Sequence, residues 1–304
     1  MHDIDWNALK YILKVAETRS TARAAKALGV NPTTVMRKIT AFEQRSGLRL
    51  FRRKQTGYET TLECDTLVDQ IRRMEDRASI IQGEILGLEN VVHGTLTVST
   101  TDSAMTAVLG PCFATFTERN PTIQITVSVS TDRVNLNRKD ADIALRGGVS
   151  APQNSAKALS GLAFCVYADC EMQSSWDGTP LRDLPWIAPG GGLKRSTVHD
   201  WMKANVPPTR VRITADTFLT ARTLAESRIG AAVLPCCLGD TAPSLSRFGD
   251  PIADIQTTLW IMVAADLEEA PRARLFVDHM EHAIAEYRDL LEGRCPADGT
   301  VSIS

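Results

Sequence analysis

The sequence lacks the features that mark membrane-spanning, secreted or disulfide-stabilised proteins. No apolar run reaches the ~18 residues that a membrane-spanning helix needs, and the first residues, Met1 to Trp6, do not form a signal peptide. The seven cysteines are odd in number and none has CxxC spacing, which favours reduced thiols over a disulfide framework. We therefore expect a cytoplasmic protein that makes no membrane contact.

Recognisable catalytic motifs are missing as well. The chain has no nucleophile elbow, no glycine-rich phosphate loop after a strand and no HExxH motif. The nearest candidates for an acid–base pair, His199 and Asp200, lie beside Trp201 on a predicted helix, with no serine or cysteine placed to match them. We predict that the protein is not an enzyme and has no catalytic residue, no metal site and no cofactor.

Charge is divided unevenly along the chain. The 304 residues are enough for two or three domains and carry a net charge of −2. Residues 1–63 hold 12 Lys and Arg against 6 Asp and Glu, whereas the remainder hold 22 against 30. A basic N-terminal module on an acidic body is the division expected of a DNA-binding head joined to a sensor or partner domain.

Residues 21–45 carry the pattern of two short helices around a tight turn. The first helix is predicted over Thr21–Leu28, and Gly29 follows it at the position that tolerates a positive φ. Asn31 and Pro32 then open a second helix with one apolar stripe. This is the helix-turn-helix shape, in which the second helix enters the DNA major groove. Two short helices around a glycine also occur in many all-α proteins. The predicted buried stripe is Val35, Ile39 and Phe42.

A basic segment with strand character follows the second helix. Arg52, Arg53 and Lys54 stand beyond a group of apolar anchors, Gly57 gives a turn, and residues 58–61 alternate in strand fashion. The pattern predicts a wing, a two-stranded loop whose basic tip lies along the phosphate backbone. A solvated charge cluster is the alternative interpretation. The predicted anchors are Leu48, Leu50 and Phe51.

Residues 5–62 resemble the winged helix-turn-helix of the LysR-type transcriptional regulators. The family usually has serine where this chain has Met36, and we expect the change to affect base preference because a thioether has no hydroxyl. It usually closes the wing with Thr-Glu-Ala-Gly, where this chain has residues 61–65. The resemblance implies a DNA-binding domain over residues 1–62. The matching residues are the alanines of the first helix, Val30, Val35, Arg37, Ile39, Ala41-Phe42-Glu43, Gly47-Leu48-Arg49-Leu50-Phe51, Arg53 and Gly57-Tyr58.

We predict that the two parts of this head contact DNA differently. The first turn of the second helix would reach base edges, with Thr34 and Arg37 as readers and Met36 against a thymine methyl group. The wing cations, and a threonine at the start of the first helix, would hold phosphates. The predicted DNA-binding residues are Thr21, Pro32, Thr33, Thr34, Met36, Arg37, Lys38, Arg52, Arg53 and Lys54.

Residues 63–92 are predicted to form one long helix. No proline interrupts it, and apolar residues recur at alternating spacings of 3 and 4, a heptad seam. A seam this narrow favours a coiled coil between two chains, and hence a homodimer; packing on the chain's own body is the alternative. The resemblance agrees, since LysR-type regulators have their dimerising linker helix here, and it alone implies a tetramer. The seam residues are Cys64, Leu67, Ile71, Met74, Ala78, Ile81, Ile85 and Leu88.

Strands and helices alternate through the body predicted over residues 93–294, ahead of a disordered tail at 295–304. Strand–helix–strand order with short connections indicates a parallel sheet covered by helices. A second α/β unit follows, joined to the first by extended crossings near 164–168 and 262–266. Helices are predicted to about Phe116, over 197–204, from Asp216 to Ser227 and over 271–291. Strands are predicted at 95–99, 123–129, 141–146, 162–168, 184–187, 211–214, 229–234 and 259–264.

This order of elements is similar to that of the effector domain of LysR-type regulators, which itself resembles periplasmic binding proteins. The best local matches are Asp142-Ile143-Ala144 and Gly230…Leu234-Pro235, so the resemblance covers about residues 5–291. It implies an α/β fold class: an N-terminal winged helix-turn-helix, a long linker helix and a two-lobed periplasmic-binding-protein-like effector domain.

Polar residues gather at the predicted strand ends of the body. Ligands of such sheets bind at the carboxyl ends of strands, near helix N-termini. Hydroxyls, helix N–H groups and an arginine suit a small organic anion with an apolar part, although each serine or threonine alone is also an ordinary helix cap. The predicted ligand-binding residues are Thr100, Thr101, Ser103, Ser128, Ser130, Thr131, Arg146, Gly190, Thr217 and Phe218.

Together these features favour a LysR-type regulator whose DNA binding or promoter activation is controlled by a small ligand in the C-terminal cleft. Its expected partners are double-stranded DNA, a small-molecule effector and a second copy of the chain. A thiol redox-sensing regulator of the same fold is the alternative, because Cys165 and Cys170 are five residues apart and Cys236 and Cys237 are adjacent. Vicinal cysteines rarely bridge, and cytosolic cysteines mostly serve packing, which weighs against it.

Overall fold

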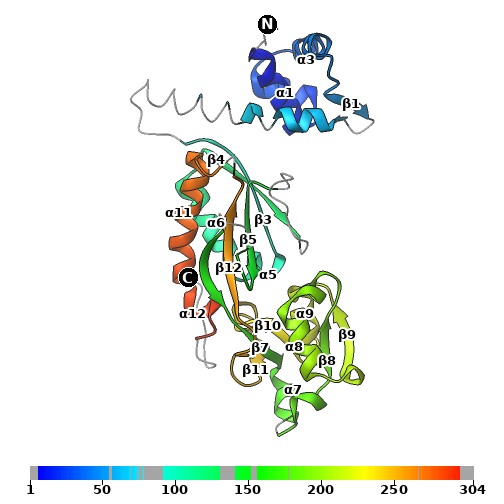
Figure 1. Ribbon diagram of the computed structural model, residues 1–304, viewed down its shortest axis with the longest axis vertical. Helices are drawn as coiled ribbons and strands as arrows, with labels where there is room; N and C mark the ends of the chain where they lie inside the picture. The colour runs from blue at the N-terminus through cyan, green and yellow to red at the C-terminus, as the bar shows by residue number, and fades with distance from the viewer. Residues whose placement is uncertain are drawn as a thin grey trace. The chain divides into compact units, whose positions relative to one another are not determined.

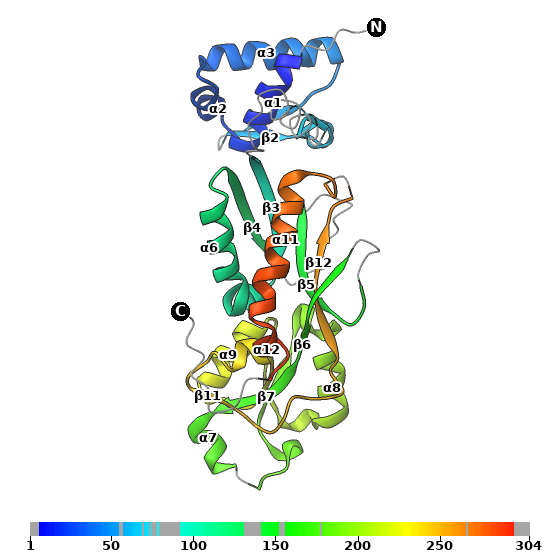
Figure 2. The same cartoon turned by 90° about the vertical axis from the view of Figure 1, so that its left-hand side faces the viewer.

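The chain folds into two compact units, Met1–Val91 and Val92–Ser304, seen in a computed structural model (Figures 1 and 2). The tail predicted at 295–304 and the segment 131–140 lie outside the described residues. Within the described residues, no helix is long and apolar enough to cross a membrane. The structure describes residues 6–54, 57–68, 70–72, 74, 78, 92–130, 141–151, 156–176, 178–265 and 267–294.

Three helices form the core of the N-terminal unit. Each buries one face, and the third buries the predicted stripe of Val35, Ile39 and Phe42. Ala24 and Ala25 are buried on the second helix, where their small side chains allow the first helix to pack close. The helices are α1 (Trp6–Thr18), α2 (Thr21–Leu28) and α3 (Pro32–Ser46).

The turn between α2 and α3 has the predicted helix-turn-helix form. Gly29 adopts the left-handed conformation with φ of 65°, and its N–H donates to the carbonyl groups that end α2. Asn31 is extended, and Pro32 occupies the first turn of α3, where its missing N–H leaves no bond unmade. Ser20 caps α2, because its hydroxyl accepts the N–H of Arg23 at 3.4 Å.

The wing consists of β1 (Phe51–Lys54) and β2 (Gly57–Thr60), which pair antiparallel. Glu43 of α3 holds its base, since Glu43 Oε1 accepts the backbone N–H of Leu50 at 2.7 Å and that of Phe51 at 3.3 Å. Hydrogen bonds to an ionised carboxylate are stronger than neutral ones. The wing is therefore attached directly to the helix predicted to read DNA.

The apolar anchors before the wing differ from the prediction at one position. Leu50 and Phe51 are buried, but Leu48 is 40% exposed. Leu48 follows Gly47, whose left-handed conformation ends α3, and the chain turns into the core only after it. The prediction that Leu48 is an anchor is wrong.

The predicted linker helix is described only at its start. Residues 62–68 and 70–72 are helical, beginning at Thr61, whose hydroxyl accepts the N–H of Cys64 at 3.2 Å and donates to the carbonyl of Arg49 at 2.7 Å. These first turns belong to the core of the head through Cys64, Val68 and Ile71. The seam residues Ile81, Ile85 and Leu88 lie outside the described residues.

A five-stranded mixed sheet forms the first lobe of the C-terminal unit (Figure 1). Its order is β4-β3-β5-β12-β6, and the first three strands are parallel, as predicted. The strand β12 runs antiparallel to both of its neighbours, because it returns from the second lobe. The strands are β3 (Gly94–Thr100), β4 (Ile123–Val129), β5 (Ile143–Gly148), β6 (Lys157–Leu162) and β12 (Thr257–Val263).

One continuous helical segment follows β3 and changes its winding. It consists of α5 (Asp102–Ala104), the π-helix η1 (Met105–Leu109) and α6 (Gly110–Arg119). Pro111 lacks an N–H, and in a regular helix its ring clashes with the carbonyl four residues back. The wider π turn, closed by the Gly110 N–H and the Met105 carbonyl, lies directly ahead of this proline.

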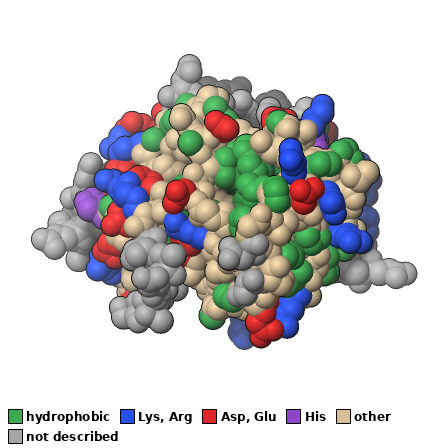
Figure 3. Space-filling model, turned by 90° about the horizontal axis from the view of Figure 1, so that it is seen from below, with side chains coloured by type: hydrophobic (Ala, Val, Ile, Leu, Met, Phe, Trp, Pro, Cys, Tyr) green, Lys and Arg blue, Asp and Glu red, His purple; other side chains and the backbone are tan. Residues whose placement is uncertain are grey.

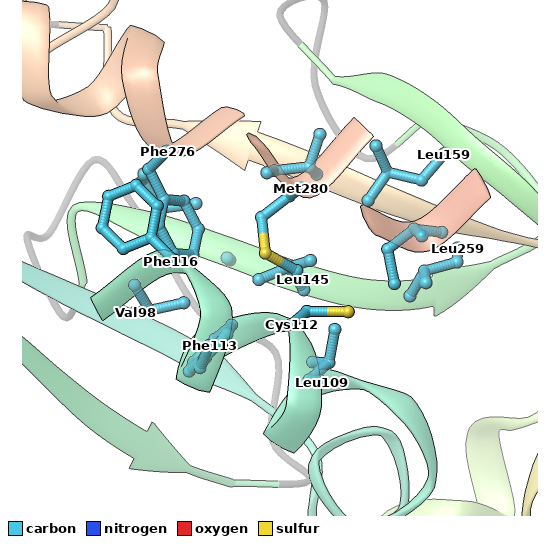
Figure 4. Packing of buried hydrophobic residues seen from close by; sticks show 14 of the residues in the cluster. Val98, Leu109, Cys112, Phe113, Phe116, Leu145, Leu159, Leu259, Phe276 and Met280 are labelled. Atoms are coloured by element: carbon cyan, nitrogen blue, oxygen red, sulfur yellow. The ribbon is translucent and has the colours of Figure 1, made fainter. Parts of the chain in front are cut away.

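The first lobe's core lies between its sheet and the packed helices α6 and α11 (Pro271–Glu286) (Figure 4). The rings of Phe116 and Phe276 meet edge to face with centroids 5.0 Å apart. The final predicted helix, 271–291, is interrupted at Tyr287 and continues as α12 (Arg288–Leu291).

The second lobe contains the antiparallel sheet β10-β7-β11 and the parallel pair β8-β9. A bridge between Trp186 and Ala231 links the two. The helix predicted from Asp216 begins instead at Phe218, because the hydroxyl of Thr217 accepts the N–H of Thr220 at 3.0 Å. The strands are β7 (Phe164–Asp169), β8 (Trp186–Pro189), β9 (Val211–Ala215), β10 (Ala232–Pro235) and β11 (Leu245–Arg247). The helices are α7 (Cys170–Ser175), η3 (Leu181–Asp183), η4 (Gly191–Arg195), α8 (Thr197–Asn205), η5 (Pro208–Arg210), α9 (Phe218–Glu226) and α10 (Cys236–Gly239).

The chain crosses from the first lobe to the second between β6 and β7 and returns between β11 and β12. The crossing predicted near 164–168 falls within β7, directly after the first passage. The crossing predicted near 262–266 falls at the end of β12, after the return. The C-terminal helix adds a further link: Ala163 donates to the Leu291 carbonyl and Arg247 donates to that of Gly293, both at 2.9 Å.

Candidate functional site

The first turns of α3 present polar groups on the side opposite the buried stripe. Because Val35 and Ile39 are held in the core, the rotation of this helix about its axis is fixed. Hydroxyl, thioether and cationic groups are of the types that contact base edges and phosphates in a major groove. Pro32, Thr33 and Arg37 are exposed, and Thr34, Met36 and Lys38 are half-buried.

The wing carries exposed cations. Arg52, Arg53 and Lys54 are all exposed, and Lys54 Nζ lies 2.7 Å from Glu59 of the opposite strand. A solvent-exposed pair of this kind contributes about 0–1 kcal/mol, so a phosphate can replace the carboxylate. Thr21 is half-buried in the first turn of α2, where backbone N–H groups lack helical acceptors.

The end of the second lobe has a different surface. Acidic and basic side chains are interspersed there around an apolar strip (Figure 3). The electric fields of closely spaced charges of opposite sign largely cancel, and salt screens the remainder beyond the Debye length of about 8 Å at physiological ionic strength. The described side chains of this face therefore form no patch of a single charge sign that would attract a polyanion.

A cavity of about 690 Å³ lies between the two lobes of the C-terminal unit. Its volume is within the range of about 300–1,000 Å³ that is usual for small-ligand sites. The first lobe contributes the start of α5 and the end of β5, and the second contributes residues around η4, α8 and α9. Its polar lining includes Thr101, Ser103, Arg146, Ser196 and Thr197.

Arg146 is the most unusual group in this lining. It lies on β5, and its Nη2 donates to Ser99 Oγ at 2.8 Å. Its Nε and Nη1 are buried and have no hydrogen-bond partner among the residues that the structure describes. Burial lowers the pKa of Arg146 to about 10, which leaves the guanidinium charged at neutral pH. The unused donors of a buried cation can bind an anion.

Hydroxyl groups flank the start of α5. Thr101 is its N-cap and accepts the Ala104 N–H at 3.3 Å. The hydroxyls of Thr101 and Ser103 lie 3.2 Å apart, so one donates to the other. The second of these hydroxyls is buried on the cavity wall. Thr101 therefore serves both as a helix cap and as part of the cavity lining.

Four of the ten predicted ligand residues line the cavity, namely Thr101, Ser103, Arg146 and Phe218. Five others are absent from the lining: Thr100, Ser128, Ser130, Gly190 and Thr217. Thr131 lies outside the described residues. The ligand contacts themselves stay predictions for all ten.

Each absent residue has a local structural role or position that explains its absence. Thr100 is fully buried in β3, and the exposed Ser128 lies on the edge strand β4. The Ser130 N–H donates to the Thr100 carbonyl at 3.1 Å. Thr217 caps α9. Gly190 is in close contact with β9, because a Cβ there would lie 3.3 Å from Thr214 Cβ.

Sequence reasoning missed several lining residues of the second lobe. Arg195, Ser196 and Thr197 line the cavity where η4 leads into α8. The signal was present, since Ser196 precedes the predicted helix at 197–204 in the position of an N-cap, and its hydroxyl accepts the His199 N–H at 3.3 Å. Asp102, between the two predicted hydroxyl residues, was missed as well.

The thiols are placed poorly for redox sensing. Cys165 is buried in β7, and the four extended steps from it to Asp169 alone span about 13 Å, which is too far for a bridge between Cys165 and the exposed Cys170. Burial raises the pKa of Cys165 and of Cys237 to about 12, so neither forms an appreciable amount of reactive thiolate near pH 7.

Two family models match the chain, one in each unit. The bacterial regulatory helix-turn-helix protein model of the lysR family matches residues 6–65. The LysR substrate binding domain model matches residues 89–285, which is more than half of the chain. The chain belongs to the LysR family of transcriptional regulators. Both units of this LysR-family protein are thus accounted for, in the order that the fold class requires.

Its relatives are transcriptional regulators. The Mau operon transcriptional activator of Paracoccus denitrificans is 24% identical over 284 residues, which are 93% of this chain and 98% of that protein. The HTH-type transcriptional regulator CrgA of Neisseria meningitidis serogroup C is 28% identical over 242 residues, 76% of this chain and 78% of that protein.

Solved structures of LysR-type regulators share the fold. A full-length variant of OxyR from Pseudomonas aeruginosa matches with a TM-score of 0.67 at 17% identity, over 93% of this chain and 95% of that chain. Full-length CbnR complexed with its target DNA matches with a TM-score of 0.55 at 17% identity, over 92% of this chain and 100% of that chain. Likenesses at this identity establish the fold alone.

Membership in the family defines the general activity. The protein is a DNA-binding transcriptional regulator with an effector-binding domain. Its partners are double-stranded DNA and a small-molecule effector.

Proposed function

We propose that the effector is a small organic anion that binds in the cavity between the lobes, with its anionic group on Arg146. The observation that carries this proposal is the buried guanidinium whose Nε and Nη1 have no partner among the described residues. An anion accepting these two donors would satisfy them in a setting of low dielectric, where charged hydrogen bonds are strong. Hydroxyls of Thr101 and Ser103 would add neutral hydrogen bonds.

The apolar part of the effector would lie against aromatic side chains. Phe164 and Phe218 both line the cavity, and their ring centroids are 5.5 Å apart. A hydrocarbon skeleton that leaves water for this surface gains about 25 cal/mol per Å² of apolar area buried. The cavity therefore suits an organic acid better than an inorganic ion.

Sequence-specific DNA binding would depend on α3. In this proposal Thr34 and Arg37 contact base edges and Met36 contacts a thymine methyl group, while the wing cations and Thr21 hold phosphates. The residues proposed to read or hold DNA remain those predicted from the sequence. Access to chromosomal DNA would place the protein in the cytoplasm, where it regulates transcription and catalyses no reaction.

We propose three functional segments, with DNA binding in residues 1–62, dimerisation in 63–92 and effector binding in 93–294. The heptad seam supports a homodimer through the middle segment. Effector binding between two lobes would favour one lobe arrangement over another and so shift the population of assemblies that bind the promoter. Such a shift requires that the effector bind the two arrangements with different affinity.

A fluorescence-anisotropy titration tests the proposal. The DNA upstream of the protein's own coding region is compared with a scrambled duplex of equal composition at two salt concentrations. Tighter, salt-sensitive binding to the native duplex is expected. Small carboxylic acids are then added to the wild type and to Arg146→Gln, and only the wild type is expected to respond. Equal responses of the two proteins would refute the assignment of the anion to Arg146.

A further inference from the structure

The cavity carries a cation from each lobe. Arg146 lines it from β5 of the first lobe, and Arg195 lines it from the second lobe, at the end of η4. The Arg195 side chain is exposed and forms no ion pair with any residue that the structure describes. Neither arginine is thus neutralised by a carboxylate of the described protein.

One acidic side chain also belongs to the described lining, and its own helix engages it. Asp102 Oδ1 accepts the N–H of Ser103 at 2.7 Å in the first turn of α5. A carboxylate in the first turn of a helix is stabilised by the backbone N–H groups there. Asp102 therefore has a local role, and both guanidinium groups remain available to a ligand.

We infer that the effector is a dicarboxylate, with one carboxylate on Arg146 and the other on Arg195. The inference rests on the proposed function and adds the second anionic group and the second lobe. A monocarboxylate would occupy Arg146 and leave Arg195 in water. A dicarboxylate uses both cations and joins the lobes through its own carbon skeleton.

The surroundings of the two arginines support this arrangement. Beside Arg146 the lining carries the hydroxyls of Thr101 and Ser103, and beside Arg195 it carries Ser196 and Thr197. On the second lobe these residues begin α8, a helix of nine residues whose first N–H groups favour an anion. Each lobe thus offers an arginine together with hydroxyl groups.

The remaining lining suits the skeleton between two carboxylates. Val108, Leu162, Phe164 and Phe218 are apolar and come from both lobes. A chain of methylene groups needs no hydrogen bonds and packs against such side chains. The cavity therefore offers charge for two ends of a ligand and apolar surface for its middle.

The two cations differ in burial, and this predicts unequal effects. The donors of Arg146 are already buried, whereas Arg195 is exposed and loses hydration when a carboxylate binds it. Arg146 should therefore determine whether any carboxylate binds. Arg195 should determine the preference for a second carboxylate.

Isothermal titration calorimetry of the full chain tests the inference. Succinate, glutarate and adipate are compared with butyrate, valerate and hexanoate, so that each diacid has a monoacid with the same number of carbons. The best diacid is expected to bind the wild type at least about tenfold more tightly than its monoacid, a difference of about one well-formed charged contact. The series of lengths finds the span between the guanidinium groups.

Three variants separate the outcomes. Arg195→Gln should reduce the diacid preference to less than about twofold while leaving monoacid affinity unchanged, and Arg146→Gln should abolish binding of both series. Arg212→Gln, an exposed arginine of the same lobe outside the cavity lining, is the matched control and should behave as wild type. Tryptophan fluorescence of each variant verifies that the C-terminal unit is folded, because four of the five tryptophans lie in that unit.

The failures are distinguishable. Equal binding of diacid and monoacid by the wild type, or a diacid preference that persists in Arg195→Gln, overturns the dicarboxylate inference and leaves the organic-anion proposal standing. Absence of binding for every acid by a wild-type protein that binds DNA overturns both.

Discussion

The arginines predicted to contact DNA in the N-terminal unit and Arg146 of the C-terminal unit are placed in opposite ways. In the N-terminal unit Arg37, Arg52 and Arg53 are exposed on α3 and on the wing. In the C-terminal unit the Nε and Nη1 atoms of Arg146 are buried in a cavity wall without a described partner. The same guanidinium group thus faces water in one unit and is withdrawn from it in the other.

The difference would follow from the anions that we propose the two units bind. A DNA backbone is a polymer that reaches only the protein surface, and its contacts are screened by salt and accompanied by counterion release. A small anion can enter a cavity, where screening is weak and each hydrogen bond is stronger. Salt should therefore weaken DNA binding far more than effector binding, and substitutions can test each side of this contrast.

The largest effect is expected for Arg146→Gln. Loss of a buried charged interaction typically removes about 2–5 kcal/mol of binding free energy, or roughly 30-fold to several thousand-fold in affinity. The effector-free variant should unfold at the same temperature as the wild type or higher, because an unpaired buried charge is removed. Calorimetry and thermal unfolding measure the two quantities, with Arg212→Gln as control. A large loss of stability without effector would contradict the view of Arg146 as an unused cation.

The next largest effect is expected for Arg37→Ala. Removal of a base-reading arginine costs about 1–3 kcal/mol and relaxes specificity at that base pair. The ratio of affinities for the native and scrambled duplexes should therefore fall by about 5- to 150-fold, while the mass of the assembly is unchanged. Gln44→Ala, on an exposed position of the last turns of α3, is the matched control. Unchanged discrimination would count against α3 as the reading helix.

A smaller and less selective effect is expected for Arg52→Ala combined with Arg53→Ala. Removing one cation from a phosphate reduces the magnitude of the negative slope of log affinity against log salt by about 0.9. The double variant should therefore reduce this magnitude by about 2 and weaken binding to every duplex alike. Anisotropy titrations at several salt concentrations give the slope. A selective loss for the native duplex would assign base contacts to the wing instead.

The smallest effect concerns the buried thiols, which give the C-terminal unit an alkaline limit. Burial raises the folded pKa of Cys165 to about 12 from an ordinary value of 9.0. The contribution of the protonated Cys165 thiol to the free energy of unfolding is fully present below about pH 9. It is lost as the pH rises through about 12, because the thiol ionises at lower pH in the unfolded chain than in the folded one. Urea midpoints at about pH 8 and about pH 10 should fall less for Cys165→Ala than for the wild type. An equal fall would exclude this thiol as a contributor.

Local elements were predictable because their causes are local. The stripe of Val35, Ile39 and Phe42 follows helical spacing, and Gly29 ends α2 by the conformation that only glycine adopts freely. The prediction that Leu48 is a buried anchor was wrong because burial depends on where the chain turns after α3, and periodicity does not specify a turn. Ile71 is instructive as well: it is buried with the head, so a charge placed there would unfold the head as well as test the seam.

The cavity was less predictable because its walls come from separate segments of the chain. Arg146 followed from its place at the end of a predicted strand, but Arg195 required knowledge of how the second lobe faces the first. Of the three adjacent glycines, Gly190 serves close packing against β9 and Gly191 has φ of 46° beside Asp216, whereas Gly192 lines the cavity. The strand β6, with the sequence KALSGL, lacked clear alternation and was missed.

The C-terminal helix has a mechanical consequence for the two lobes. Two lobes that are joined by only two chain crossings can rotate relative to each other about the line that joins the crossings. The hydrogen bonds from Ala163 to Leu291 and from Arg247 to Gly293 fasten the chain end to the first crossing and to the second lobe. This third attachment restricts rotation of one lobe relative to the other. Shortening the chain to Glu286 should therefore widen the range of angles between the lobes and weaken the effect of a bound ligand on that angle.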